Sequence, residues 1–128
     1  MGKGIFVTGT ATDVGKTYVT GLIVKKLKEE GMNPVYFKAA MSGNEKKEDG
    51  SLIPGDALWV KNISGIEQSL KSMCPYVYEH AYSPHLASRI EGNPVVLSVV
   101  MDGFRKLKEQ YGLYYGRGKW RYFVSNLL

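Results

Sequence analysis

Residues 9–17 read Gly-Thr-Ala-Thr-Asp-Val-Gly-Lys-Thr, a loop with a glycine near each end that closes on a lysine and a hydroxyl side chain. The mainly apolar residues 5–8 before it predict a buried strand, and residues 16–30 after it predict a helix. Strand, glycine-rich loop, Gly-Lys-Thr and helix follow one another in this order in phosphate-binding loops. We therefore expect backbone N–H groups and the positive end of the helix to surround phosphate oxygens.

Two side chains at the end of the loop have chemistry that suits a nucleoside triphosphate. Lys16 can supply positive charge to the β- and γ-phosphates, and the Thr17 hydroxyl can ligate Mg²⁺. Five residues separate Gly9 from Gly15, where the usual pattern has four, so the loop is a variant of the standard one.

The pattern continues into a second strand. Apolar side chains recur three and four residues apart between residues 19 and 27, as on one buried helix face. Pro34 cannot continue the helix, and residues 35–38 predict a strand. Two strands joined by a helix imply a right-handed unit in a parallel sheet. We predict an α/β domain of the P-loop NTPase type, with helices flanking a parallel sheet.

Polar residues follow the second strand. Ligands in such sheets bind beyond the carboxyl ends of the strands, so residues 38–42 share a rim with the phosphate loop. Lys38 has two possible interpretations. It can reach a γ-phosphate or a developing anion, or it can be a solvated surface lysine. Asp56 is either the N-cap of a short helix or a Mg²⁺ ligand, and the two roles are compatible.

The rest of the chain shows weaker signals. We expect a mobile polar loop at 44–52, an extended run at 73–78, and an amphipathic helix at 95–111. Ser83 and Pro84 predict a helix start, with His85 near the ligand.

Composition limits the class of protein. The chain has 128 residues, 44% of them hydrophobic, which suits one domain with a core. We find no apolar run of about 18 residues and no signal-peptide pattern, and the single cysteine, Cys74, predicts a packing residue. A cytoplasmic protein is the simplest expectation. The net charge of +5 falls to +2 without Arg117, Lys119 and Arg121, so the basic character is partly a property of the tail.

Several motifs together resemble dethiobiotin synthase. They are the loop at residues 8–17, Lys38 with Ser42-Gly43, Asp56-Ala57-Leu58, and Ser83-Pro84-His85, in the order and spacing of that family. The resemblance covers about residues 3 to 111. It implies an ATP-dependent ligase of biotin biosynthesis that uses Mg²⁺.

The resemblance also implies roles for individual residues. Nucleotide binding is implied for Asp13, Val14, Gly15, Lys16, Thr17, Tyr18 and Asp56; Mg²⁺ binding for Thr17 and Asp56; catalysis for Lys38 and Lys16; and substrate binding for Thr12 and Ser42. In that family CO₂ adds to an amine of 7,8-diaminononanoate, the carbamate attacks the γ-phosphate of ATP, and the second amine closes the ring. Intact members are expected to be homodimers, with no nucleic-acid or membrane partner.

The chain departs from the family after residue 111. Family members are longer and have a third strand that runs into Val-Glu-Gly-x-Gly-Gly, whose Glu binds Mg²⁺. Residues 112–128 contain no acidic residue and show no apolar alternation, so we expect a sheet truncated after about two strands. A DNA sequence can be written from permitted codons for residues 111–126 that encodes Val-Glu-Gly-Ser-Gly-Gly once one G is removed. Trp120 has a single codon, which limits the choice of such a sequence. We therefore predict an N-terminal part of the domain at 1–111 and a frameshifted tail at 112–128.

Three alternatives stay open. Without the missing half the chain can be a non-catalytic nucleotide-binding fragment, and we expect it to be poorly stable and weakly active or inactive. A related ATPase of the chromosome-partitioning type usually has an extra lysine early in the loop, where this chain has Thr10-Ala11-Thr12. Nucleic-acid binding would depend on the basic tail.

Overall fold

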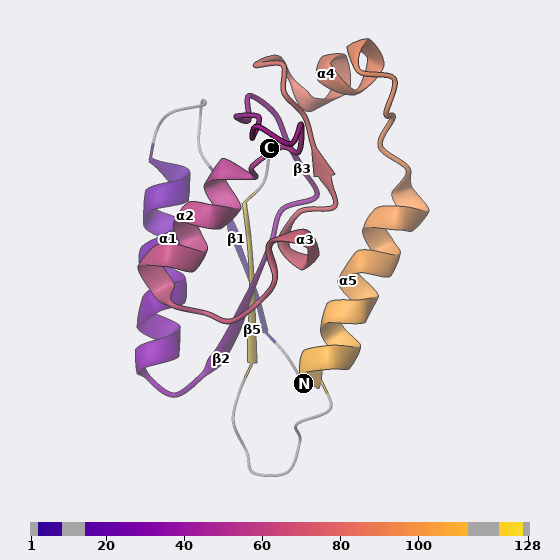
Figure 1. Cartoon of the computed structure of the whole chain (residues 1–128). Helices are drawn as coiled ribbons and strands as arrows, with labels where there is room; N and C mark the ends of the chain where they lie inside the picture. The colour runs from indigo at the N-terminus through magenta and orange to yellow at the C-terminus, as the bar shows by residue number, and fades with distance from the viewer. Residues whose placement is uncertain (1–2, 9–14, 113–120, 127–128) are drawn as a thin grey trace.

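The computed structural model describes residues 3–8, 15–112 and 121–126 (Figure 1). The strands are β1 (Lys3–Val7), β2 (Asn33–Phe37), β3 (Ala40–Met41), β4 (Tyr76–Val77) and β5 (Arg121–Asn126). The helices are α1 (Lys16–Glu29), α2 (Gly55–Ser64), α3 (Leu70–Met73), α4 (Pro84–Ile90) and α5 (Leu97–Gly112). These bounds confirm the predicted first two strands, the first helix, and the helices that begin at Pro84 and near residue 95, within two residues at most ends.

The main sheet has three parallel strands in the order β1-β5-β2. Val124 of β5 is the central register position, since it lies opposite both Ile5 of β1 and Tyr36 of β2. A second, two-stranded parallel sheet pairs Ala40 with Tyr76 and Met41 with Val77. The predicted α/β class with a parallel sheet is confirmed.

The number of strands was predicted wrongly. Residues 121–126 form β5 in the middle of the sheet, so the chain has the third strand whose absence we expected. We expected no strand because residues 112–128 lack alternation of apolar and polar residues. A central strand of a parallel sheet is normally covered on both faces, however, and its sequence is then a continuous apolar run. Tyr122-Phe123-Val124 is such a run. The presence of a strand at residues 121–126 does not test whether residues 112–128 arise from a frameshift.

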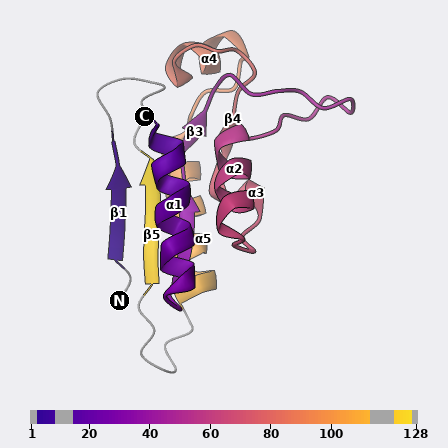
Figure 2. The same cartoon turned by 90° about the vertical axis from the view of Figure 1, so that its left-hand side faces the viewer.

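Helices lie on both faces of the main sheet (Figures 1 and 2). One face packs with α1 and α2 around a core of buried residues, which are Val24, Tyr36, Met41, Ala57, Val60, Ile66, Met73 and Cys74. On the other face α5 packs on β2, where the rings of Phe104 and Phe37 lie 5.7 Å apart, edge to face. Within the described ranges, no helix is long and apolar enough to cross a membrane.

Two local predictions need correction. The N-cap of α2 is Pro54, so Asp56 lies inside the first turn and is not the cap. The loop at 44–52 is a loop as expected, but Lys46 and Leu52 form an antiparallel bridge across it. Ser83 is the N-cap of α4, where its hydroxyl accepts a hydrogen bond from the Leu86 N–H at 3.4 Å, as predicted.

Candidate functional site

The first part of the site is the beginning of α1. Gly15 is its N-cap and has φ of +85°, a left-handed conformation that favours glycine. Lys16 and Thr17 follow in the first turn, where backbone N–H groups have no partner within the helix and the helix dipole is positive. This geometry suits an anion. The other loop residues predicted to bind, which are Thr12, Asp13 and Val14, lie outside the described residues.

The second part joins the end of β2 to the first turn of α2. The Lys38 Nζ lies 2.8 Å from the Asp56 Oδ2, in an ion pair with a hydrogen bond. The Lys38 side chain is only 15% exposed, whereas that of Asp56 is 36% exposed. Lys38 is therefore not a solvated surface lysine. The structure brings together two of the residues that the sequence singled out separately.

Asn44 holds the start of α2 in place, and sequence reasoning missed this role. Its buried side-chain amide donates to the carbonyls of Met41 and Tyr78, at 3.0 and 2.8 Å, and its Oδ1 accepts from the Gly55 N–H at 3.1 Å. This contact satisfies an N–H of the first helical turn, as an N-cap side chain would. Because Asp56 follows directly, Asn44 fixes the position of the carboxylate beside Lys38.

Helices α1 and α2 pack side by side and begin at the same end of the sheet (Figure 1). The rings of Tyr18 and Trp59 lie 5.5 Å apart between them. Gly21 lets the two helices approach closely, since a Cβ at this position would lie 2.2 Å from the Trp59 ring. The close packing places Asp56 on the same rim as Lys16 and Thr17.

Ser42 lies further along this rim, just after β3. Its hydroxyl donates to the Tyr82 carbonyl, immediately before the Ser83-Pro84 start of α4. The structure therefore joins the predicted substrate residue Ser42 to the turn before His85. His80 stacks on Tyr82 next to this contact, with ring centroids 6.1 Å apart.

The donor set can be compared with what a metal needs. Across residues 3–8, 15–112 and 121–126, no three His, Cys, Asp or Glu side chains form a group that could hold a metal ion. Mg²⁺ needs fewer protein ligands than that, because it keeps several waters and binds through one or two carboxylates together with substrate phosphates. A hydroxyl at Thr17 and a carboxylate at Asp56 fit this requirement.

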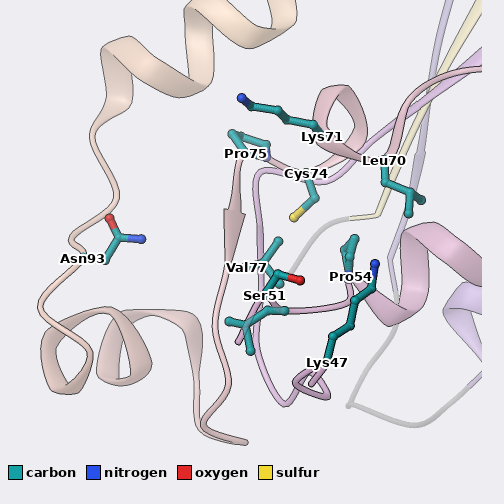
Figure 3. Close-up of a pocket in the computed structure, with 10 residues that line it drawn as sticks. Lys47, Ser51, Pro54, Leu70, Lys71, Cys74, Pro75, Val77 and Asn93 are labelled. Atoms are coloured by element: carbon teal, nitrogen blue, oxygen red, sulfur yellow. The ribbon is translucent and has the colours of Figure 1, made fainter. Parts of the chain in front are cut away.

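A pocket of about 540 Å³ lies between the 44–54 loop, α3 and β4. Figure 3 shows Cys74 directed into it, with Lys47 and Lys71 at its sides. The thiol is buried and donates to the Tyr76 carbonyl at 3.2 Å. This burial confirms Cys74 as a packing residue.

Burial raises the pKa of the Cys74 thiol from 9.0 to about 12. We expect Ellman's reagent to react slowly with the native chain at pH 8 and at an ordinary rate in denaturant, because the thiolate is the nucleophile. The same shift makes the thiol's contribution to stability complete below pH 9 and lost progressively as the pH rises toward 12. Fast reaction of the native thiol would contradict this burial.

A parallel sheet that leads into Gly-Lys-Thr at the start of a helix defines a P-loop protein. A family profile described as an AAA domain matches residues 3–113, and the chain belongs to this family. The chain is also similar to proteins named ATP-dependent dethiobiotin synthetase BioD, which confirms the resemblance predicted from the motifs.

Three of these relatives come from different species. The protein of Clostridium novyi (strain NT) is 49% identical over 111 residues, which are 87% of this chain and 46% of the relative. The protein of Clostridium kluyveri is 45% identical over 118 residues, which are 92% of this chain and 48% of the relative. The protein of Brachyspira hyodysenteriae is 44% identical over 111 residues, which are 87% of this chain and 48% of the relative. The chain therefore spans about half the length of these relatives.

Proposed function

We propose that this chain is the nucleotide-binding part of a dethiobiotin synthetase, and that it binds ATP with Mg²⁺. The observation that carries the proposal is the Lys38–Asp56 pair on the rim where α1 begins with Lys16 and Thr17. Similarity to named synthetases supports the choice among ATP-dependent reactions. A cytoplasmic location and a homodimer of the intact protein belong to the same proposal.

Each residue has a distinct task in the proposed reaction. Lys16 binds the β- and γ-phosphates, and Lys38 neutralises charge on the γ-phosphate as it is transferred. Thr17 and Asp56 would hold Mg²⁺, which when bound offsets phosphate charge. Thr12 and Ser42 orient the diamine, 7,8-diaminononanoate, on the adjoining part of the rim.

The proposed chemistry proceeds in three balanced steps. One amine of the diamine attacks CO₂ and loses a proton, which gives a carbamate. A carbamate oxygen then attacks the γ-phosphorus of ATP and releases ADP, so that a carbamic-phosphoric anhydride forms. The second amine attacks the carbonyl carbon, loses a proton, expels phosphate and closes the five-membered urea. Phosphate is a much better leaving group than hydroxide, which is why ATP is needed.

We further propose that residues 112–128 are a frameshifted tail and that turnover by this chain is weak or absent. The family profile stops matching at residue 113, and residues 112–128 contain no acidic residue. β5 therefore supplies strand backbone without a carboxylate for Mg²⁺. A DNA read across these codons, with an intact mass of the protein, tests the origin of the tail. A gene that reads as the printed sequence, with no long frame after a one-base slip, would refute it.

Nucleotide binding is tested by titrating the full chain with ATP in Mg²⁺ by calorimetry. We expect Lys16→Ala to weaken binding by about 10- to 150-fold, since a hydrogen bond to a charged group is worth roughly 1.5–3 kcal/mol. Lys25→Ala, which removes an exposed lysine from the same helix, is the matched control and is expected to bind normally. Equal affinity of both variants would overturn the site.

Asp56 is tested by the dependence of ATP binding on Mg²⁺. Asp56→Asn keeps the size of the side chain but removes the negative charge that a divalent cation requires. We expect the gain in ATP affinity on adding Mg²⁺ to fall by about tenfold in this variant, an effect of the size of one charged contact. An unchanged Mg²⁺ dependence would show that Asp56 serves only to pair with Lys38. Dethiobiotin formation, followed in parallel, reports turnover separately from binding.

A further inference from the structure

Residues 79–82 connect β4 to α4, and one carboxylate binds the first two of them. The side chain of Glu91, the C-cap of α4, accepts from the Glu79 N–H through Oε1 at 3.0 Å and from the His80 N–H through Oε2 at 3.3 Å. The His80 Nδ1 lies 3.1 Å from the same Oε2. Both oxygens of a single side chain therefore hold this short segment.

The carboxylate of Glu91 lies at a place that disfavours a negative charge. The end of a helix is the negative end of its dipole. Burial, with the side chain only 18% exposed, would by itself raise the pKa of this carboxyl. The bonds from the Glu79 and His80 N–H groups and from the His80 ring outweigh burial, so the pKa lies below its ordinary value. The charged form of Glu91 is therefore the form that holds residues 79–82.

The same segment is bonded on its other side to the residues that follow β3. The His80 carbonyl accepts from the Gly43 N–H at 3.1 Å, and the Tyr82 carbonyl accepts from the Ser42 hydroxyl. Gly43 has φ of +71°, and a Cβ on it would lie 3.4 Å from the Ala81 Cβ, so the two segments are in close contact. A shift of the segment would therefore move the partner of the Ser42 hydroxyl.

The end of α4 that carries Glu91 is itself anchored near β4. Tyr78 is fully buried just after β4, and its hydroxyl donates to the Asn93 carbonyl at 2.6 Å. The Asn93 N–H in turn donates to the Ser88 carbonyl of α4 at 2.9 Å. Figure 2 shows α4 beyond β3 and β4, at one end of the molecule. Glu91 lies between Ser88 and Asn93 in the chain, so it is a fixed point for the segment that it binds.

We propose that Glu91 is a positioning residue for the part of the rim that binds the diamine. Its charged carboxylate holds residues 79–82, and these in turn hold the Ser42 hydroxyl and the Ser83-Pro84 start of α4. Glu91 acts through this segment and not by contact with a substrate. The positioning role rests on the proposed function of Ser42, whereas the hold of Glu91 on the segment can be measured without a ligand.

Amide hydrogen exchange of the full chain, followed by NMR, measures this hold. Glu91→Gln keeps the size of the side chain but removes its charge and replaces one acceptor with a donor. We expect the Glu79, His80 and Gly43 amides to exchange about 10- to 150-fold faster, as for loss of a hydrogen bond to a charged group.

Three comparisons show whether the change is local. The Tyr36 amide, which donates to the Gln68 side chain at 2.8 Å in another part of the fold, is expected to keep its protection. Glu67→Gln makes the same chemical change at an exposed position and is expected to alter none of these rates. Glu91→Asp keeps the charge on a shorter side chain, and it replaces the glutamine variant if that variant loses protection at Tyr36.

Diamine binding tests the positioning role itself. 7,8-Diaminononanoate is titrated into the full chain and followed by the chemical shift of the Ser42 amide, with ATP and Mg²⁺ titrated in parallel. We expect Glu91→Gln to weaken diamine binding by about tenfold, an effect of the size of one charged contact, and to leave ATP affinity unchanged. A general loss of stability would not produce this difference. Ser42→Ala is expected to weaken diamine binding as well, but to leave the Glu79 amide protected.

Unchanged exchange of the Gly43 amide in Glu91→Gln would overturn the proposal, and so would equal diamine affinity of this variant and wild type. Loss of ATP affinity together with diamine affinity would also overturn it, because Glu91 would then act on the whole fold. If the wild-type chain bound no diamine while Glu91→Gln still loosened residues 79–82, the proposed function of Ser42 would be wrong and the contact would be structural only.

Discussion

Gln68→Leu is expected to lower the free energy of unfolding by about 2–6 kcal/mol, because it leaves two buried backbone groups without partners at about 1–3 kcal/mol each. The Gln68 side chain is 2% exposed and bonds to both the N–H and the carbonyl of Tyr36. Leucine has a similar volume, so the loss measures hydrogen bonding more than packing. Since domains are stable by only about 5–15 kcal/mol, this is a large share. Urea unfolding of the full chain, followed by circular dichroism, gives the difference.

Two variants sharpen that measurement. An ionised glutamate at position 68 can accept from the Tyr36 N–H but places a buried negative charge against the Tyr36 carbonyl, so Gln68→Glu is expected to be at least as destabilising as Gln68→Leu. Glu67→Leu makes a neighbouring change at an exposed position and is expected to shift stability by less than about 0.5 kcal/mol. If Gln68→Leu unfolded at the same urea concentration as Glu67→Leu, the edge of β2 would not depend on this amide.

Local patterns predicted the first half of the main sheet well. The strand at residues 3–7, the helix at residues 16–29 and the return into β2 depend on short-range signals, which are apolar periodicity, Gly15, and Pro34 after the helix. The apolar face predicted for the helix was only partly right, because Ile23 and Leu27 pack against the core whereas Val19 and Leu22 are exposed. β5 was missed because its place in the sheet is set by pairing with strands more than eighty residues away. A run of three apolar residues in a tail has no local feature that identifies it as a central strand.

In the candidate site, too, some residues were predicted from the sequence, whereas their contacts were not. Lys38 and Asp56 were each identified from sequence, but their 2.8 Å contact depends on how α2 returns to the sheet. Asn44 and Gln68 were missed because polar residues in connecting segments are expected to face water. Both are buried and bond to backbone groups of other elements. The phosphate loop itself was predicted at residues 9–17, of which 9–14 lie outside the described residues.

Gly21→Leu is expected to lower the free energy of unfolding by about 3 kcal/mol, near the upper end of the usual cost of overpacking. A Cβ on Gly21 would lie 2.2 Å from the Trp59 ring and 2.7 Å from the Ile63 Cγ2, which is closer than real contacts allow. Trp59 cannot move away easily, because its ring also packs on Tyr18. The same variant should weaken ATP binding, since the contact between α1 and α2 places Asp56 on the rim where α1 begins with Lys16 and Thr17.

Two glycine-to-alanine variants separate the steric clash at Gly21 from the effect of helix propensity. Alanine is favoured over glycine in a helix by about 1 kcal/mol at any interior position. Gly103 in α5 has room for it, because a Cβ there would lie 3.8 Å from the Phe37 ring. We therefore expect Gly103→Ala to raise the melting temperature and Gly21→Ala to lower it, although both make the same chemical change. A rise for both variants would show that α1 and α2 are not in close contact at Gly21, and the placement of Asp56 beside Lys16 and Thr17 would lose its structural basis.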